Sequence, residues 1–300
     1  MIHTGKTTLF RGVATALATP FAEGEIDYAA LGHMVAYQIA AGIDALVFCG
    51  TTGEAATLTD AEYAALCRFA VETVGGRVPV LIGCGTNHTA AACARARTAA
   101  GAGADGLLVV TPYYNKGTQE GLLRHFTAVA DAGGIPLILY HVPGRTGVRL
   151  SCADLLRLSA HPLIVGIKEA SGDMDLFADL CAAGEAAPAL YTGCDSQILP
   201  ALSLGGAGVI SVISNLFPRE TAAVCRLYAA GRGEESRALF LRYLPLVRLL
   251  FAETNPAPLK CALAHAGQCR EEMRLPLYPV PRVLRERLHR EMDALTQGES

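Results

Sequence analysis

The feature that most constrains the fold is a regular alternation of short apolar runs with longer amphipathic stretches. The apolar runs have the length of buried strands and lie at residues 13–20, 45–50, 80–85, 107–112, 137–142, 164–169, 190–193 and 208–213. Between them apolar residues recur at helical spacing, for example over 28–41, 60–74, 89–100 and 119–132. Strands alternating with helices are typical of a parallel sheet, and eight such units favour a closed barrel over an open doubly wound sheet. We therefore predict an α/β fold, a (β/α)8 TIM barrel.

The helix-to-strand junctions and the C-terminal part add detail to this prediction. The segment AGIDAL at 41–46 recurs as AGADGL at 102–107, and its glycine suits the left-handed residue that ends many helices. Beyond the eighth run, helical patterns continue at 219–231, 235–251, 258–266 and 281–295, and Pro245 is expected to kink the second of these. No Ser/Gly-rich linker precedes them. We expect a barrel over 1–218 and a C-terminal helical extension over 219–300 that packs on it.

Composition excludes several classes of protein. Hydrophobic residues make up 51% of the chain and charged residues 18%, so a disordered chain is excluded. The net charge of −3 and the lack of a basic run argue against nucleic-acid binding. The uncharged stretch 196–218 has the length of a membrane span, but Pro200 and the pair Gly205-Gly206 make it a short helix, a break and a strand. We expect no contact with a membrane.

No cofactor, metal or secretion signal is evident. The 10 cysteines form no C-x-x-C pair and no zinc-type spacing with histidine, which predicts reduced thiols in a cytoplasmic protein. The glycine pattern at 101–106 matches G-x-G-x-x-G but follows a helix and precedes a strand, the reverse of a dinucleotide site. Arg11 interrupts the apolar segment that ends at Ala18, so we interpret this segment as the first strand and not as a signal peptide.

Lys168 is the most informative residue. The chain contains few lysines and many arginines, yet this lysine ends the apolar run 164–169, where a barrel carries its catalytic groups. One interpretation is a structural ion pair with Glu169, because buried charges are usually paired. The other is an amine that forms a Schiff base. A lysine of pKa ~10.4 is neutral in roughly one molecule in 2,500 at pH 7, and a desolvation shift of about 3 units raises that to about a quarter to a third.

Other strand ends carry hydroxyl groups. Thr51 and Thr52 lie between glycines, and either cap a turn or present backbone N–H groups to a carboxylate. The tyrosines at 113, 114 and 140 are either core aromatics or a proton relay around the lysine. In the loop that follows Tyr140 we interpret His141 as structural. Arg145 is either a solvated residue or a bidentate partner for a substrate carboxylate.

These segments together resemble a known family. The motifs are GTTGE at 50–54, PYYN at 112–115, LYHVPGRTG at 139–147, GIKEA at 166–170, GVISV at 208–212 and NPAPLK at 255–260. In combination they resemble the dihydrodipicolinate synthase / N-acetylneuraminate lyase family of pyruvate-dependent class I aldolases. The resemblance extends over nearly the whole chain.

The resemblance implies a mechanism. Lys168 would form an imine with pyruvate, and Tyr140 would move protons at that imine. Thr52 and Tyr114 would complete a hydroxyl relay to solvent, and Thr51 with Thr52 would hold the pyruvate carboxylate. The resulting enamine would attack the aldehyde of aspartate semialdehyde, and the product 4-hydroxy-tetrahydrodipicolinate would form as the ring closes.

The resemblance also implies further contacts, an assembly and the absence of any cofactor. Gly193 and Ile210 would supply backbone contacts to pyruvate, and Arg145 would bind the carboxylate of the second substrate. No metal or organic cofactor is expected, since the lysine imine is itself the electron sink. A homotetramer built from two tight dimers is expected, with Tyr114 reaching into the neighbouring subunit's site.

Three alternatives differ in substrate or in class. The aldehyde would be different in an N-acetylneuraminate lyase or a 2-keto-3-deoxy sugar acid aldolase, although Arg145 favours the synthase. A metal-dependent class II aldolase would need a cluster of histidine and carboxylate ligands, and we find none in the sequence. A non-catalytic metabolite-binding barrel would retain a costly buried lysine without a use for it.

Feedback inhibition by lysine is expected to be weak or absent. In inhibited members of the family a glutamate at the position of Ala91 holds the effector's ammonium group, and histidines or a glutamate stand at the positions of Asp60 and Tyr63. Asn87 and Tyr113 match the inhibited members. Without a carboxylate at Ala91, a buried ammonium group would lose several kcal/mol of binding.

Overall fold

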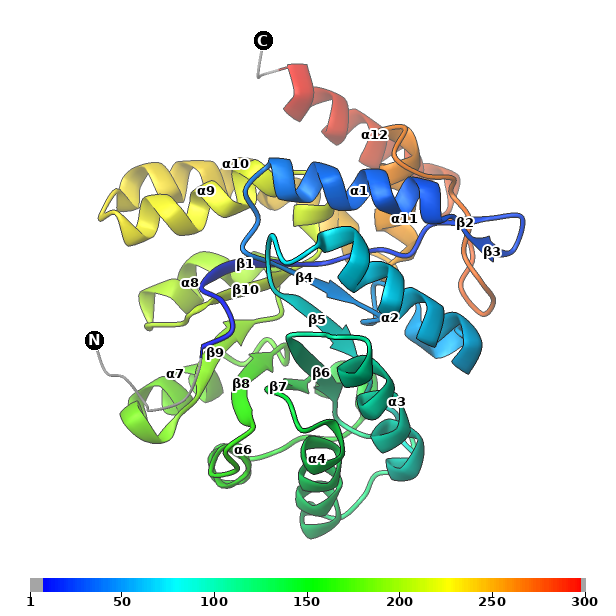
Figure 1. The fold of residues 1–300 in the computed structure, drawn as a ribbon. Helices are drawn as coiled ribbons and strands as arrows, with labels where there is room; N and C mark the ends of the chain where they lie inside the picture. The colour runs from blue at the N-terminus through cyan, green and yellow to red at the C-terminus, as the bar shows by residue number, and fades with distance from the viewer. Residues whose placement is uncertain (1–7, 298–300) are drawn as a thin grey trace.

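The computed structural model describes residues 8–297, and its central element is a closed barrel of parallel strands (Figure 1). The strands are β1 (Gly12–Ala16), β4 (Ala45–Phe48), β5 (Val80–Gly83), β6 (Gly106–Val110), β7 (Leu137–His141), β8 (Ile164–Glu169), β9 (Ala189–Thr192) and β10 (Gly208–Ser211). They pair in the order β1-β10-β9-β8-β7-β6-β5-β4, and β1 closes the ring on β4. The predicted TIM barrel is confirmed, and each of the eight apolar runs contains one strand.

Side chains alternate between the two faces of the barrel wall. Small or branched residues such as Ala14, Val47 and Ile138 fill the interior, where the hydroxyl of Tyr191 donates to the carbonyl of Phe10 at 2.7 Å. The intervening residues face the surrounding helices and form a second, larger apolar cluster. This period of two settles which strand residues can point into the barrel.

Helices cover the outside of the barrel. They are α1 (Tyr28–Ala40), α2 (Asp60–Val74), α3 (Thr89–Gly101), α4 (Gln119–Gly133), α6 (Cys152–Ser159), α7 (Met174–Ala182), α8 (Ile198–Ser203) and α9 (Pro218–Ala229). Gly42 and Gly103 follow α1 and α3 with φ of 80° and 90°, so the repeated glycine has the predicted left-handed conformation. Thr59 and Glu62 form a reciprocal capping box that begins α2 next to the 50–54 loop.

The C-terminal helices lie together along one side of the barrel (Figure 1). They are α10 (Gly233–Leu250), which runs on through Pro245, α11 (Ala257–His265) and α12 (Arg282–Gln297). The expected boundary at 218/219 falls immediately before the body of α9. Since α9 contacts β1 and follows the last barrel strand, we propose to count it as the eighth barrel helix and to begin the extension at α10.

Several short elements were not predicted. They are the hairpin β2 (Phe21–Ala22) and β3 (Glu25–Ile26), the turn of helix α5 (Pro143–Thr146), and the 3-10 turns η1 (Ala55–Thr57), η2 (Gly184–Ala186), η3 (Asp195–Gln197) and η4 (Ile213–Asn215). Each contains four residues or fewer, which is too short to show periodicity.

The structure also bears on the expected absences. The uncharged stretch 196–218 forms α8, β10 and η4, as its prolines and glycines predicted. Within residues 8–297 no helix has the length and hydropathy of a membrane span. All 10 cysteines are free thiols, and no cluster of three or more potential metal ligands occurs in the same residues.

Candidate active site

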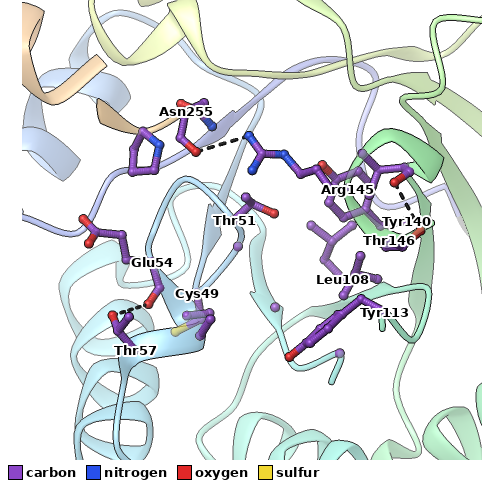
Figure 2. Close-up of a pocket in the computed structure, with 18 of the residues that line it drawn as sticks. Cys49, Thr51, Glu54, Thr57, Leu108, Tyr113, Tyr140, Arg145, Thr146 and Asn255 are labelled. Carbon is purple, nitrogen blue, oxygen red and sulfur yellow. Dashed lines mark hydrogen bonds between the residues drawn. The ribbon is translucent and has the colours of Figure 1, made fainter. Parts of the chain in front are cut away.

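Two cavities meet at the carboxyl ends of the barrel strands. The first has a volume of about 300 Å³ and lies between the 50–57 loop, Tyr113, Tyr140, Arg145 and Asn255 (Figure 2). The second, of about 390 Å³, shares Tyr140 and Arg145 with it and extends toward Gly193 and the start of η3. Tyr140 therefore stands between two open spaces large enough for small metabolites.

The strand register brings Lys168 and Tyr140 together. The two residues are direct partners on β8 and β7, and both point into the barrel. The amine Nζ of Lys168 lies 4.3 Å from the centroid of the Tyr140 ring. The predicted pair thus occupies one level of the barrel wall, with the phenol placed to move protons at the amine.

Lys168 is buried without an ion pair. Only 5% of the residue is exposed, and within the described part of the chain no carboxylate lies within 4 Å of its amine. Burial lowers the pKa of Lys168 to about 8; the charge of Asp195 opposes this shift, and Arg145 reinforces it. At that pKa about a tenth of the amine is neutral at pH 7. The amine is therefore a usable nucleophile.

Gly193 makes room for the lysine side chain. A Cβ atom at this position would lie 2.7 Å from Cε of Lys168 and 2.6 Å from Cβ of Ala170. Any larger residue would push the lysine out of place, so glycine is required here by close approach. Ile210 is fully buried on β10 and faces the same interior.

The two threonines of the 50–54 loop have different partners. Thr51 lines the first cavity together with Tyr140, whereas Thr52 Oγ1 accepts a hydrogen bond from Nδ2 of Asn255 at 3.0 Å. Burial raises the pKa of Tyr140, while Arg145 and Thr51 oppose this increase. The role of Thr52 in the proton relay stays a prediction. Its hydroxyl contacts Asn255 in the C-terminal extension, whereas Thr51 and Tyr140 line the same cavity.

Arg145 spans the mouth of the first cavity. It lies on α5, and its Nη2 donates to the backbone carbonyl of Asn255 at 3.2 Å (Figure 2). The arginine is thus held over the space beside Tyr140 and is not a freely solvated residue. A carboxylate that enters this space would meet Arg145 and the ring of Tyr140, against which the amine of Lys168 lies.

The chain matches the model of the Dihydrodipicolinate synthetase family over residues 9–295. The chain belongs to this family. It is 45% identical to 4-hydroxy-tetrahydrodipicolinate synthase of Syntrophus aciditrophicus over 95% of this chain and 98% of that protein, and 44% identical to that of Geobacter metallireducens, with 93% and 97% covered. The solved dihydrodipicolinate synthase of Thermotoga maritima superposes with a TM-score of 0.93 at 39% identity, covering 96% of this chain and 99% of that one.

Tyr114 does not enter its own site. It is 88% exposed with φ of 70°, whereas the neighbouring Tyr113 lines the first cavity. A large exposed aromatic residue held in a left-handed conformation is unusual, and a partner surface would account for it.

The residues that follow Lys168 and Tyr140 on the two strands decide whether Lys168 has an ion pair. His141 and Glu169 follow Tyr140 and Lys168 on the same strands and point outward. Nδ1 of His141 donates to Glu169 at 2.6 Å, since its Nε2 accepts from the backbone N–H of Leu150 at 3.0 Å. Glu169 therefore pairs with His141 and not with Lys168, so the ion-pair interpretation of Lys168 is wrong and the structural interpretation of His141 is confirmed.

Sequence reasoning missed Asn255 and Asp195 as site residues. Asn255 contacts Thr52 through its side chain and Arg145 through its carbonyl, and its Oδ1 has no partner among residues 8–297. Asp195 is fully buried and accepts from the N–H groups of Val212 and Ile213, both at 2.9 Å. The only available signal for Asn255 was its place in the NPAPLK motif.

Proposed function

We propose that this chain condenses pyruvate with L-aspartate 4-semialdehyde to give 4-hydroxy-tetrahydrodipicolinate, a step of lysine and diaminopimelate biosynthesis. The observation that supports this most is the unpaired amine of Lys168 against Tyr140, in a chain that belongs to the dihydrodipicolinate synthetase family. An enzyme that forms an imine requires such an amine next to a proton donor.

The first half-reaction uses Lys168, Tyr140 and Thr51. The amine attacks C2 of pyruvate to give a carbinolamine, and Tyr140 donates the proton with which the hydroxyl leaves as water. Loss of a proton from the pyruvate methyl group then gives the enamine. Thr51 lines the same cavity as Tyr140 and carries protons to and from it. The pyruvate carboxylate is held by backbone N–H groups of Thr51 and Thr52, with Gly193 and Ile210 in backbone contact.

The second half-reaction takes place beside Arg145. The enamine carbon attacks the aldehyde carbon, which becomes the hydroxyl-bearing C4 of the product. The substrate amine then attacks the imine carbon and displaces Lys168 as the ring closes, so one water leaves in total. Arg145, held over the cavity by the carbonyl of Asn255, binds the carboxylate of the second substrate.

Trapping tests this function. Borohydride added with pyruvate should leave a reduced adduct on Lys168, located by peptide mass mapping, because only an imine is reduced in this way. With wild-type protein, the absence of any adduct would contradict imine chemistry. A panel of aldehydes should show preference for aspartate semialdehyde, and a preference for N-acetylmannosamine would reassign the second substrate.

We further propose a homotetramer of two tight dimers in the reducing cytoplasm, in line with the free thiols. Tyr114, Leu275 and Tyr278 are 88%, 77% and 77% exposed in the single chain, more than expected for an isolated surface. Tyr114 then completes the relay in the neighbouring subunit. Mixing Lys168→Ala chains with Tyr114→Phe chains should restore part of the activity in verified heterodimers, and no restoration would place Tyr114 outside the partner's site.

We also propose that lysine inhibits this enzyme weakly at most, although the related enzyme of Cyanidioschyzon merolae was solved with lysine bound. Asp60 lies 3.6 Å from the guanidinium of Arg95, which itself lies 5.0 Å from the centroid of the Tyr63 ring. The guanidinium of Arg95 therefore already contacts the carboxylate of Asp60 and the ring of Tyr63, the two groups that would attract an ammonium ion. Strong inhibition in a steady-state lysine titration near the substrate KM would contradict this proposal.

A further inference from the structure

Lys260 is a second buried lysine, outside the catalytic barrel wall. It lies on α11, its side chain is fully buried, and its Nζ forms an ion pair with Oε1 of Glu54, whose side chain is also fully buried. The same Nζ donates to the carbonyl of Glu272 at 2.7 Å and lies 4.2 Å from the centroid of the Phe21 ring. This charge is therefore satisfied entirely by the protein.

Glu54 ends the loop that carries Thr51 and Thr52. Its φ is 54°, a left-handed conformation that is uncommon for a residue with a side chain. Its second carboxylate oxygen accepts from the backbone N–H of Arg274 at 3.1 Å, and its carbonyl accepts from Oγ1 of Thr57 at 3.0 Å (Figure 2). Both oxygens of the carboxylate are thus bound by residues of the C-terminal extension.

The extension contacts the loop at a second point. Asn255 donates to Thr52, and from the barrel side Thr19 Oγ1 donates to the carbonyl of Gly53 at 2.8 Å. The loop is therefore held at three consecutive residues, Thr52, Gly53 and Glu54. Glu54 is among the residues that line the first cavity (Figure 2), but its carboxylate and the amine of Lys260 are both inaccessible to solvent.

A buried ion pair is an expensive way to stabilise a fold. Desolvation offsets most of the attraction, and neutral residues of similar volume are often equally stable or better. Packing alone therefore does not explain two buried charges at this place. The two charges are explained by their geometric effect, since a carboxylate bound at both oxygens holds the loop in one conformation.

We propose that Lys260 and Glu54 are positioning residues, which hold the backbone N–H groups of Thr51 and Thr52 where the carboxylate of pyruvate binds. The inference rests on the proposed function, which places the pyruvate carboxylate on that loop. It assigns the C-terminal extension a task in substrate binding, although neither residue touches the substrate.

The test is a double variant, Glu54→Gln with Lys260→Met, which removes both charges and keeps the volume. The matched control is Glu271→Gln with Arg285→Met, an ion pair of the same extension that does not reach the loop. We expect the KM for pyruvate to rise about tenfold in the first and to stay within about twofold in the second, as for one weakened charge-assisted hydrogen bond to a carboxylate. The turnover number at saturating pyruvate and the KM for the aldehyde should change by less than about threefold.

A folded double variant with wild-type pyruvate KM would overturn the inference. If thermal denaturation shows that the double variant does not fold, Glu54→Asp serves instead, because it keeps the ion pair and shortens the connection to the loop. A wild-type pyruvate KM in Glu54→Asp would equally overturn the inference. Failure of the wild-type protein to trap pyruvate contradicts the proposed function, whereas equal trapping rates in wild type and double variant at pyruvate concentrations below the wild-type KM contradict only the positioning role.

Discussion

Lys168 and Lys260 are the same residue type in similarly apolar surroundings, and the structure uses them in opposite ways. Burial lowers the pKa of both amines. Glu54 is in direct contact with Lys260 and raises its pKa in turn, whereas Lys168 lies against the ring of Tyr140 and has no ion pair within residues 8–297. Desolvation alone therefore does not produce a nucleophile. A buried amine becomes one when no carboxylate pairs with it and its neighbour, here Tyr140, lines a cavity.

Replacement of the two lysines should have the largest effect on condensation, because only the amine of Lys168 is expected to react with pyruvate. Lys168→Ala should reduce condensation by at least ~10³-fold, because the covalent step is lost. The Glu54→Gln, Lys260→Met double variant should still turn over at saturating pyruvate. Borohydride trapping followed by mass mapping checks both proteins. A pyruvate adduct on Lys260 would contradict the assignment of Lys168 as the reactive amine.

The free energy of unfolding should change in opposite directions when the two lysines are replaced singly. Lys260→Met alone leaves the Glu54 carboxylate buried without a partner, which we expect to cost about 3 to 5 kcal/mol in the free energy of unfolding. Lys168→Met should instead raise the free energy of unfolding at pH 7 by about 1 to 3 kcal/mol. The reason is that the folded-state pKa of Lys168, about 8, lies below that of the unfolded chain, so protonation favours unfolding until the pH exceeds the unfolded pKa.

Urea denaturation of the two single variants and the wild type at pH 7 measures both effects. Loss of stability in Lys168→Met would mean that the amine has a stabilising partner after all. An unchanged free energy of unfolding in Lys260→Met would mean that the Glu54 carboxylate does not depend on the amine of Lys260.

The surroundings of Lys168 could be predicted from the sequence, and those of Lys260 could not. Lys168 could be identified because it ends a strand, and parallel register then places it beside Tyr140. The partner of Lys260 could not be identified, because Glu54 lies about 200 residues away in sequence and on a loop. The same holds for Asn255 and Thr52. The period of strands and helices encodes the barrel, whereas contacts between loops and the extension depend on packing that no local pattern records.

The substitution Arg145→Ala tests the charges around Lys168. We expect kcat/KM for aspartate semialdehyde to fall by roughly 10²-fold, as for a lost charge-assisted contact, while pyruvate trapping persists. Since Arg145 also lowers the pKa of Lys168, the trapping rate below pH 8 should decrease slightly. Initial rates with each substrate varied in turn measure the two effects. Equal damage to pyruvate trapping and to aldehyde use would place Arg145 at the pyruvate carboxylate instead.

The smallest expected effect is a shift in pH dependence at Asp195. Trapping of pyruvate requires the neutral amine, so its rate should rise with pH and level off above about 8, the pKa of Lys168. Asp195 favours the charged amine and so holds this pKa up. Asp195→Asn keeps a carbonyl oxygen for the N–H groups of Val212 and Ile213 and removes the charge. The rising limb should therefore move to lower pH, and trapping at pH 6.5 should become faster by less than about tenfold, a shift of under one pKa unit. The matched control is Asp293→Asn, which alters a carboxylate bound to His265 in the C-terminal extension and should leave the profile in place. A rising limb that stays where it is in Asp195→Asn would show that Asp195 does not act on the pKa of Lys168, and a move to higher pH would contradict the sign of its effect.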